Sequence, residues 1–348
     1  MNSATLRLRY TQFFILCLLG ISLCIIAPQS LSGGISQFES HLWGRPFLIT
    51  SYTNLRLKLG DHVFPQVVVG KDGWLEYGKE LDIYQNADKV SLKTLKNTQQ
   101  KLQELYEELR KRNITLILVI PPNKATIYPD KLPNEIQPPN PKSKLAAFTT
   151  YIQQHGPPVL VDLRPALLNG RKQQDVYYKT DTHWNAYGAF IGYTEIMTAL
   201  SKTYPQLAPK SLKDFKIITS QPYAHDIPQI MGATTLLEPK AIFDPKENDL
   251  SWVILNDDNP VPLQVSTTSK KDLPALLMYV DSYGDGMKDF IAPHFSKATF
   301  ILTSTEYPDA LSLKTIDIVK PDVVIVEVVE RFFDVQLLDY IVNHLLPK

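Results

Sequence analysis

Three side chains in this sequence have the types that serine acyl-transfer chemistry needs. Asp181 lies two residues before His183 in the run YYKTDTHWNAYGAF, and Ser282 lies in the run LLMYVDSYGDG. Serine is a weak nucleophile at neutral pH, so it needs an imidazole to take its proton and a carboxylate to orient that imidazole. The sequence therefore predicts a triad in which the base precedes the nucleophile along the chain.

An acyl-transfer site also needs donors for the negative charge that develops on the substrate oxygen. We expect the backbone N–H groups of Ser282 and Gly284 to supply them, because both residues lie near the start of the helix expected after Ser282. Gly284 and Gly286 have no side chains, so they would let the backbone approach a substrate closely.

These residues also have structural interpretations, which the sequence leaves open. Asp181 can cap a helix that begins near Trp184 or Asn185, because a carboxylate readily accepts hydrogen bonds from the first N–H groups of a helix. Asp281 and Ser282 can cap the helix that follows them in the same way. With capping as their only role, neither motif would carry chemistry.

A metal site is a further alternative, since several residues offer carboxylate or imidazole ligands. None of them shows a paired ligand spacing such as two histidines four residues apart on a helix. We therefore predict neither a metal nor another cofactor. The candidate ligands are Asp181, His183, His225, Asp226 and His294.

Alternating strand and helix patterns supply the framework that must position these residues. Residues 114–120 form a continuous apolar, β-branched run that ends at Pro121 and Pro122, which is typical of a strand covered on both faces. Leucines recur at helical spacing in residues 91–112, which predicts an amphipathic helix. Residues 203–272 are less regular and are interpreted as an insertion or a long excursion over the site. The other expected elements are strands at 159–163, 252–255, 276–280, 300–302 and 323–328, helices near 35–58, 143–155, 185–202, 287–295 and 335–345, and a hairpin at 67–78.

This alternation predicts an α/β fold with a mostly parallel central sheet and helices on both of its faces. Reactive residues of such sheets lie in loops at the carboxyl ends of strands. Ser282 directly follows the strand expected at 276–280, as the rule requires. Asn123, Lys124 and Arg331 also follow expected strands, so we consider them substrate-binding candidates.

The overall charge argues against nucleic-acid binding. The 348 residues include 36 lysines and arginines and 36 aspartates and glutamates, so the formal net charge is zero. Affinity for nucleic acids relies on clustered cations that neutralise phosphates, and we predict no nucleic-acid partner. Both cysteines, Cys17 and Cys24, lie near the amino terminus, so the rest of the chain has no thiol for a nucleophile or a zinc ligand.

The amino-terminal segment is strongly apolar. Residues 10–28 contain no charged side chain and come close to the roughly 20 residues that span a bilayer. A cleaved signal peptide is the alternative, but the apolar stretch is long and Ala27-Pro28-Gln29 is a poor cleavage site. Arginines before the segment favour a cytoplasmic amino terminus, so we expect a single-pass inner-membrane protein whose catalytic domain is periplasmic or extracytoplasmic. The expected division is a cytoplasmic stub at 1–9, an anchor or uncleaved signal at 10–28, a juxtamembrane linker and helix at 29–60, and one domain at 61–348.

Five stretches together carry a resemblance to a known family. They are VVVGKDGWL (67–75), VIPPNKATIYPDKLP (119–133), YYKTDTHWNAYG (177–188), YVDSYG (279–284) and KPDVVIVEVVERFF (320–333), and HDIPQIMG (225–232) resembles a weaker block. In this order they resemble the SGNH-hydrolase-like domain of bacterial alginate O-acetyltransferases of the AlgX/AlgJ type. The likeness covers about residues 40–345. Val280 and Tyr283 depart from the family's serine block, which usually has arginine or glycine at the first of these positions and phenylalanine at the second.

The resemblance implies an SGNH-hydrolase-like three-layer sandwich and maps the family's triad onto Asp181, His183 and Ser282. It implies an O-acetyltransferase that moves acetyl groups onto an exopolysaccharide, as in alginate biosynthesis, through an acyl-serine intermediate. The acceptor would be a polysaccharide, and a membrane-bound O-acyltransferase partner would supply the acetyl group. Trp184 and Tyr283, beside the base and the nucleophile, are further substrate-binding candidates, although aromatic residues on helices more commonly pack in the core.

Two other functions fit the same residues. A polysaccharide acetylesterase with the same triad would release acetate into solution instead of transferring it. A non-catalytic scaffold of an envelope polysaccharide complex would keep the fold without turnover, and the intact triad argues against this function.

Overall fold

The structure is a computed structural model that describes residues 44–85, 90–136, 143–246, 249–255, 263–302, 312–333 and 342–346. The chain divides into two units, a larger one of residues 62–231 with 235–348 and a smaller one of residues 1–61 with 232–234. The described part of the smaller unit contains helix α3 (Arg45–Lys58). All candidate site residues belong to the larger unit.

The larger unit alternates strands and helices along the chain. Its strands are β1 (Val63–Phe64), β2 (Val67–Val69), β3 (Leu75–Tyr77), β4 (Thr115–Val119), β5 (Leu160–Val161), β6 (Phe215–Thr219), β7 (Ala241–Pro245), β8 (Ser251–Leu255), β9 (Leu263–Thr267), β10 (Ala275–Val280), β11 (Lys297–Leu302) and β12 (Val323–Glu327). Its helices are α4 (Gly78–Gln85), α5 (Leu92–Lys111), α6 (Lys124–Ile127), α7 (Lys144–His155), α8 (Arg164–Gly170), α9 (Ala186–Ser201), α10 (Asp226–Met231), α11 (Ser282–Asp285), α12 (Lys288–Ile291) and α13 (Leu313–Val319). Residues 342–345 are also helical.

Within the described ranges, the central sheet has seven strands in the order β5-β4-β12-β10-β11-β9-β8. The strands from β5 to β11 are parallel, and β9 and β8 add an antiparallel edge. Apolar residues fill the inner strands because both faces are covered, and every residue of β12 is buried. The carboxyl ends of β4, β12 and β10 are neighbours, so the loops that hold Lys124, Arg331 and Ser282 begin at one edge of the sheet.

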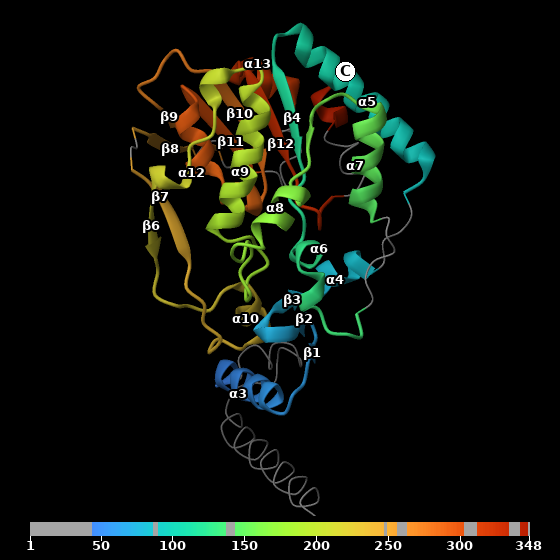
Figure 1. Cartoon of the computed structure of the whole chain (residues 1–348), viewed down its shortest axis with the longest axis vertical. Helices are drawn as coiled ribbons and strands as arrows, with labels where there is room; N and C mark the ends of the chain where they lie inside the picture. The colour runs from blue at the N-terminus through green and yellow to red at the C-terminus, as the bar shows by residue number, and fades with distance from the viewer. Residues whose placement is uncertain are drawn as a thin grey trace, which may run out of the picture. The chain divides into compact units, whose positions relative to one another are not determined.

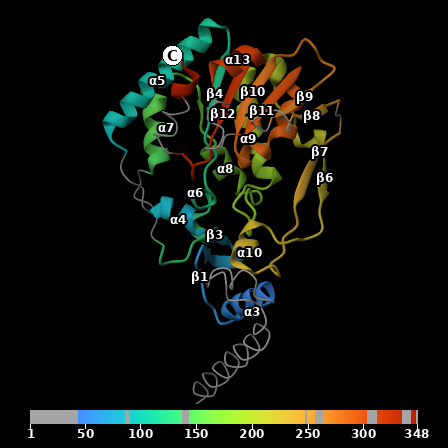
Figure 2. The same ribbon diagram turned by 180° about the vertical axis from the view of Figure 1, so that it is seen from behind.

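Helices cover both faces of the central sheet. Figure 1 shows α8, α9 and α12 in front of the strands, and α5 and α7 lie in front in the reverse view of Figure 2. In β10, Leu276, Met278 and Val280 pack in one apolar core, while Leu277 and Tyr279 pack in the other. The strand therefore sends alternate side chains to the two cores, as the period of two in a pleated strand requires.

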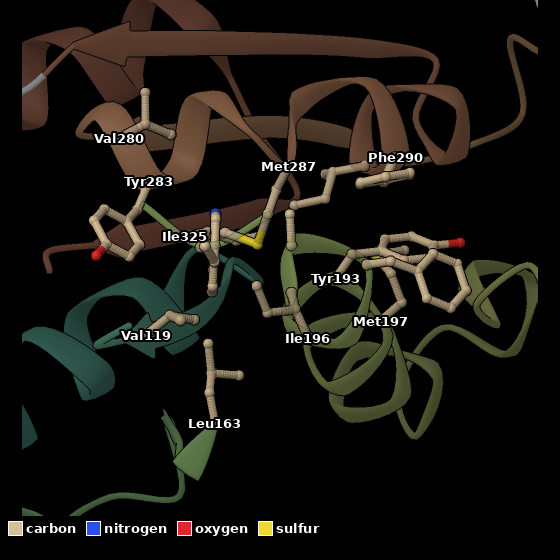
Figure 3. Packing of buried hydrophobic residues seen from close by; sticks show 14 of the residues in the cluster. Val119, Leu163, Tyr193, Ile196, Met197, Val280, Tyr283, Met287, Phe290 and Ile325 are labelled. Carbon is tan, nitrogen blue, oxygen red and sulfur yellow. The ribbon is translucent and has the colours of Figure 1, made fainter. Parts of the chain in front are cut away.

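The core on the α9 face holds the residues that follow the predicted nucleophile. Figure 3 shows Tyr283 and Met287 in one apolar cluster with Val119 of β4 and Ile325 of β12. Tyr283 and Met287 are both fully buried. Because Tyr283 is the next residue after Ser282, this packing anchors the turn that carries the serine.

The predicted α/β fold with a mostly parallel sheet is confirmed. The hairpin predicted at 67–78 is also present, and its turn uses Asp72 (φ 56°) and Gly73 (φ 81°) in the left-handed region. Strand β9 and the two-stranded ribbon of β6 and β7 were missed within residues 203–272. Four of the five residues of β6 are exposed, so no buried face imposes a periodic pattern on its sequence.

The predicted anchor at residues 10–28 lies outside the described residues, as does the stub at 1–9. None of the described helices is both long and apolar enough to cross a membrane. Helix α3 corresponds to the described part of the helix expected near 35–58, whose first residues lie outside the description. The helix expected at 335–345 is described only over its last four residues.

Candidate active site

The predicted base lies in a loop that folds back on itself. Within residues 177–184, here called the base loop, Tyr177 and Trp184 form an antiparallel bridge. Asn185 follows the loop, and its side chain caps α9 by accepting hydrogen bonds from two N–H groups of the first turn at 3.0 Å. Asp181 therefore does not cap this helix, and its carboxylate bonds to histidines instead.

A buried ammonium group supports the base loop from inside. Lys124 is fully buried at the start of α6. Its Nζ donates hydrogen bonds to the backbone carbonyl oxygens of Asp181 (2.8 Å), Lys179 (3.3 Å) and Tyr178 (3.4 Å), and to that of Leu75 on β3. Because several carbonyl groups converge on one cation, the loop has little freedom to rearrange. Lys124 thus positions the loop, and the expectation that it contacts substrate is wrong because its side chain is buried.

The predicted nucleophile begins a single helical turn after β10. The Asp281 carboxylate accepts hydrogen bonds from the N–H groups of Tyr283 (2.8 Å) and Val329 (2.7 Å), so it caps α11 and ties this turn to the segment after β12. The Tyr283 hydroxyl donates to the backbone carbonyl of Thr182 in the base loop. The turn of Ser282 and the base loop are therefore joined by a buried hydrogen bond.

A buried carboxyl group lies beneath the nucleophile turn. Burial, and then the charge of Asp281, raises the pKa of Glu327 well above its usual range. Glu327 Oε2 accepts a hydrogen bond from the Asp281 N–H at 2.9 Å, and a Cβ built on Gly284 would stand 2.6 Å from the same oxygen. The expectation that the Gly284 N–H stabilises an oxyanion stays a prediction.

The structure brings the three predicted triad residues together. His183 Nε2 lies 2.9 Å from Ser282 Oγ, and His183 Nδ1 lies 2.7 Å from Asp181 Oδ1. Burial alone would raise the pKa of Asp181, but hydrogen bonds from His183 and His225 outweigh burial and hold this pKa well below its usual range. Asp181 therefore stays ionised and can orient the imidazole with Nε2 toward the serine.

A second histidine, whose position the sequence did not predict, approaches the other oxygen of Asp181. His225 Nδ1 lies 2.9 Å from Asp181 Oδ2, and His225 Nε2 lies 3.0 Å from the backbone carbonyl oxygen of Glu238. The neighbouring Asp226 accepts hydrogen bonds from the backbone N–H and the hydroxyl of Thr182. In the sequence, the pair at 225–226 belongs only to the rejected metal alternative and to a weaker family block, because no local pattern links it to the base loop.

Arg331 reaches the nucleophile from the segment after β12. Its Nη2 lies 3.4 Å from Ser282 Oγ, and its Nη1 lies 2.8 Å from Oε1 of the fully buried Glu80. The guanidinium also lies over the Tyr283 ring, 5.2 Å from its centroid. The buried carboxylate and the aromatic face hold the guanidinium in place beside the serine. Its contact with substrate stays a prediction.

The other substrate-binding candidates are buried. Asn123 is 2% exposed, and its backbone N–H donates to Glu330 at 2.8 Å. Trp184 is 4% exposed and packs on the fully buried Tyr283 with ring centroids 5.2 Å apart. The two aromatic rings fill the core between the base loop and the nucleophile turn. Burial gives these residues a supporting role, and their contact with substrate stays a prediction.

One cluster among the described residues has the side chains that a metal ion could bind. Asp181, His183 and Asp226 each offer a ligand atom, and these atoms lie within 4.8 Å of one another. The same side chains already hydrogen-bond one another or Thr182, so a cation would have to displace those bonds. The candidate His294 lies in a different place, where its Nε2 is 2.7 Å from the Tyr193 hydroxyl oxygen. We assign no metal site to the cluster.

A groove of about 910 Å³ includes the triad in its lining. Residues 203–272 contribute to its walls, including the exposed rings of Tyr223 and Trp252 and the cation of Lys240. Amphipathic aromatic faces beside polar and charged groups suit a ligand that has both apolar faces and many hydroxyl groups. The groove therefore has the lining expected of a site for a sugar chain.

Residues 67–246, more than half of the chain, match the family model described as "SGNH hydrolase-like domain, acetyltransferase AlgX". A protein of Pseudomonas syringae pv. tomato named "Probable alginate O-acetylase AlgJ" is 26% identical over 224 residues, which cover 62% of this chain and 51% of that protein. Its namesake in Pseudomonas aeruginosa is 32% identical over 168 residues, which cover 46% of this chain and 40% of that protein. The chain therefore spans about half the length of these relatives or less.

Solved structures show the same fold. A DHHW family protein from Eubacterium siraeum matches with a TM-score of 0.60 and 17% identity, covering 83% of this chain and 99% of that one. PatB1 from Bacillus cereus matches with a TM-score of 0.58 and 16% identity, covering 77% of this chain and 98% of that one. Identities this low concern the fold alone. The family match over residues 67–246 goes further, and by it this chain belongs to the family of SGNH hydrolase-like acetyltransferase domains described for AlgX.

Proposed function

We propose that this protein is an O-acetyltransferase that moves acetyl groups onto hydroxyl groups of a polysaccharide through an acetyl-serine intermediate at Ser282. The observation that carries the proposal is the hydrogen-bond chain from Ser282 Oγ through the His183 ring to Asp181, with distances of 2.9 and 2.7 Å. Ser282 is exposed, so a substrate can reach its hydroxyl. The family description and the names of the relatives support acetyl transfer as the reaction.

The reaction has two halves that use the same base. His183 Nε2 takes the Ser282 hydroxyl proton while Oγ attacks the acetyl carbonyl, and it returns this proton to the leaving group of the donor. In the second half, His183 takes the proton of a sugar hydroxyl, whose oxygen attacks the acetyl-serine. Collapse of that intermediate releases Ser282 Oγ, which recovers the proton. Asp181 holds the ring orientation throughout.

The negative charge that develops on the acetyl oxygen is stabilised best by hydrogen-bond donors that are already in position before the reaction. No described residue accepts a hydrogen bond from the Ser282 N–H, so this group is available to a substrate oxygen. Arg331, with Nη2 3.4 Å from Ser282 Oγ, is a further donor in this proposal, beside the expected Gly284 N–H. The same cation suits an acceptor that carries carboxylates, such as the uronic acids of alginate.

The acceptor is a sugar chain that lies in the groove beside Ser282. The relatives are named as alginate O-acetylases, which makes alginate the first polymer to test. Transfer exceeds hydrolysis only if the groove places a sugar hydroxyl better than water against the acetyl-serine, and positioning of this kind can change rates by orders of magnitude. The exposed rings of Tyr223 and Trp252 are the surfaces proposed to hold the sugars.

The proposal extends to the donor and the location. Residues 10–28 would anchor the chain in the inner membrane, with the catalytic domain on the periplasmic or extracytoplasmic side. Acetyl-CoA is a cytoplasmic donor, so a membrane-bound O-acyltransferase partner would deliver the acetyl group across the membrane. Anchoring both proteins in one membrane would raise the local concentration of the donor.

The test measures acetyl transfer from p-nitrophenyl acetate to alginate oligosaccharides by mass spectrometry of the sugar products. The expected result is acetylated oligosaccharide with the wild-type protein and a loss of about 1,000-fold or more with Ser282→Ala or His183→Ala. Unchanged thermal unfolding of these variants would show that the loss is chemical. Acetate that appears only in solution, with every sugar acceptor tested, would identify an acetylesterase instead. Full turnover by Ser282→Ala would refute the proposed nucleophile.

A further inference from the structure

The ring of His225 faces hydrogen-bond acceptors on both sides. Its Nδ1 lies 2.9 Å from the Asp181 carboxylate, and its Nε2 lies 3.0 Å from the backbone carbonyl oxygen of Glu238. The His225 side chain is only 1% exposed, so water cannot replace either partner. Neither acceptor has a proton to offer, because Asp181 stays ionised and a carbonyl oxygen only accepts.

A neutral imidazole does not fit these contacts. Each neutral tautomer of His225 has one N–H and one bare lone pair, so either choice would set a lone pair against an oxygen at hydrogen-bond distance. Turning the ring over would place carbon atoms against both acceptors and forfeit both bonds. Only the imidazolium, which donates from both nitrogens, satisfies Asp181 and the Glu238 carbonyl together.

The groups that face the His225 ring also favour a cation. Tyr223 stacks on one side with ring centroids 4.3 Å apart, and Tyr178 of the base loop lies with its centroid at 4.7 Å. Aromatic faces attract cations through their electron density. Asp181 is the carboxylate in contact with this ring, and the charges of Asp181, Asp226 and Glu238 all act on the hydroxyl of the stacked Tyr223.

We propose that His225 is a permanent imidazolium that shares Asp181 with His183 and thereby sets how readily His183 takes up a proton. The inference rests on the proposed function of the triad, which it deepens. Asp181 Oδ1 serves His183, while Oδ2 serves His225. His225 keeps both protons through the reaction, so it is a positioning residue and not a proton donor.

The physical consequence concerns the charge that His183 experiences. An ionised aspartate favours the imidazolium form of a histidine that it contacts. The positive charge of His225 offsets part of the Asp181 charge. The resting His183 ring is thereby favoured as the acceptor of the serine proton, while Asp181 still fixes its orientation.

Nitrogen-15 NMR of histidine-labelled full-length protein tests the charge state directly. At neutral pH and above, we expect one histidine with two protonated ring nitrogens, and this signal should vanish in His225→Gln. In Asp181→Asn, the acceptor loses its charge, so the signal should change to that of a neutral ring. A His225 signal with a single protonated nitrogen in the wild-type protein would overturn the proposal.

The pH dependence of p-nitrophenyl acetate turnover tests the effect on the base. His225→Gln removes the cation, so the acidic limb of the kcat/KM profile should move to higher pH by about one unit. His155→Gln is the matched control, because His155 is an exposed residue at the end of α7. The same replacement there should leave the pH profile unchanged. If kcat/KM of His225→Gln falls equally at every pH, without a shift of the acidic limb, the role of His225 is purely structural and the inference is wrong.

The two proposals fail in different ways. Should Ser282→Ala keep full activity, the catalytic assignment falls, while the doubly protonated His225 signal is still measurable in that variant. Should His225 prove neutral while Ser282→Ala is inactive, the triad stands and the second histidine loses its role. If His225→Gln does not fold, the Asp181→Asn spectrum alone decides the charge state.

Discussion

Lys124 Nζ donates a 2.8 Å hydrogen bond to the backbone carbonyl oxygen of Asp181, which places a buried cation directly under the loop of the proposed base. The other carbonyl groups bound by this ammonium belong to the same loop and to β3. The orientation of Asp181 is thus determined by the hydrogen bonds from Lys124 to the main chain of the base loop, as well as by the two histidines that contact its carboxylate.

Replacing Lys124 with methionine should destabilise the protein and disable the site. Several buried carbonyl groups would lose their donor, and we expect the free energy of unfolding to fall by about 3 kcal/mol. Chemical denaturation measures this loss. Lys111→Met is the control, because Lys111 is highly exposed and its nearest ion pair is 4.0 Å long. Equal stabilities of the two variants would contradict the supporting role of Lys124.

Alanine at position 284 should disturb the nucleophile far more than alanine at position 286. A Cβ on Gly284 would stand 2.6 Å from Glu327 Oε2 and 2.7 Å from Val280, whereas a Cβ on Gly286 would meet its nearest atom at 3.2 Å. We expect Gly284→Ala to lower kcat by about 100-fold, as small displacements of reacting groups can, and Gly286→Ala to be much milder. Steady-state kinetics of the pair compare the two. Similar rates would show that the turn accommodates a side chain above Glu327.

The activity should depend on the planar shape of the Arg331 guanidinium as well as on its charge. Arg331→Lys keeps a cation near the buried Glu80 but loses the planar fork that reaches both Glu80 and Ser282, so we expect kcat/KM to fall by about 100-fold with little change in melting temperature. Arg331→Gln leaves Glu80 without a cation and should also destabilise the fold. The double variant Glu80→Gln with Arg331→Gln should regain stability without regaining activity. Recovery of activity in that double variant would exclude a direct role for the guanidinium.

His294 should make the stability of the protein depend on pH. Burial, and then the positive charges of Lys210 and Lys270, lowers the pKa of His294 from 6.5 to about 4. Between these two values the unfolded chain binds more protons than the folded one, so stability is complete above about pH 6.5 and falls as the pH drops toward 4. The expected loss is on the order of 2–3 kcal/mol.

Urea unfolding across this pH range measures the contribution of His294. In His294→Gln, whose side-chain amide can still hydrogen-bond to the Tyr193 hydroxyl, the slope of stability against pH should become shallower. The exposed His155→Gln variant should keep the wild-type slope. An unchanged slope in His294→Gln would assign the acid sensitivity to other groups.

Local patterns in the sequence were sufficient for every described strand of the central sheet except β9, and for the residue types of the candidate site. The run at 114–120 could be recognised because continuous apolar, β-branched residues ending at two prolines have one favourable environment, a strand covered on both faces. Ser282 could be placed at the carboxyl end of a strand for the same reason. The ribbon of β6 and β7 could not be recognised, since a mostly exposed strand has no face on which burial selects apolar residues.

The sequence by itself thus determined which side chains can do chemistry and which strand ends carry them. Only the tertiary structure decided what each of them touches: that Asp181 has a second histidine from 44 residues away, that Lys124 is buried under the base loop, and that the Asp281 N–H bonds to Glu327. The physical reason is that strand and helix patterns arise from neighbours along the chain. Hydrogen-bond partners and burial arise from packing between segments that are distant in sequence, so the spacing of residues within one segment does not predict them.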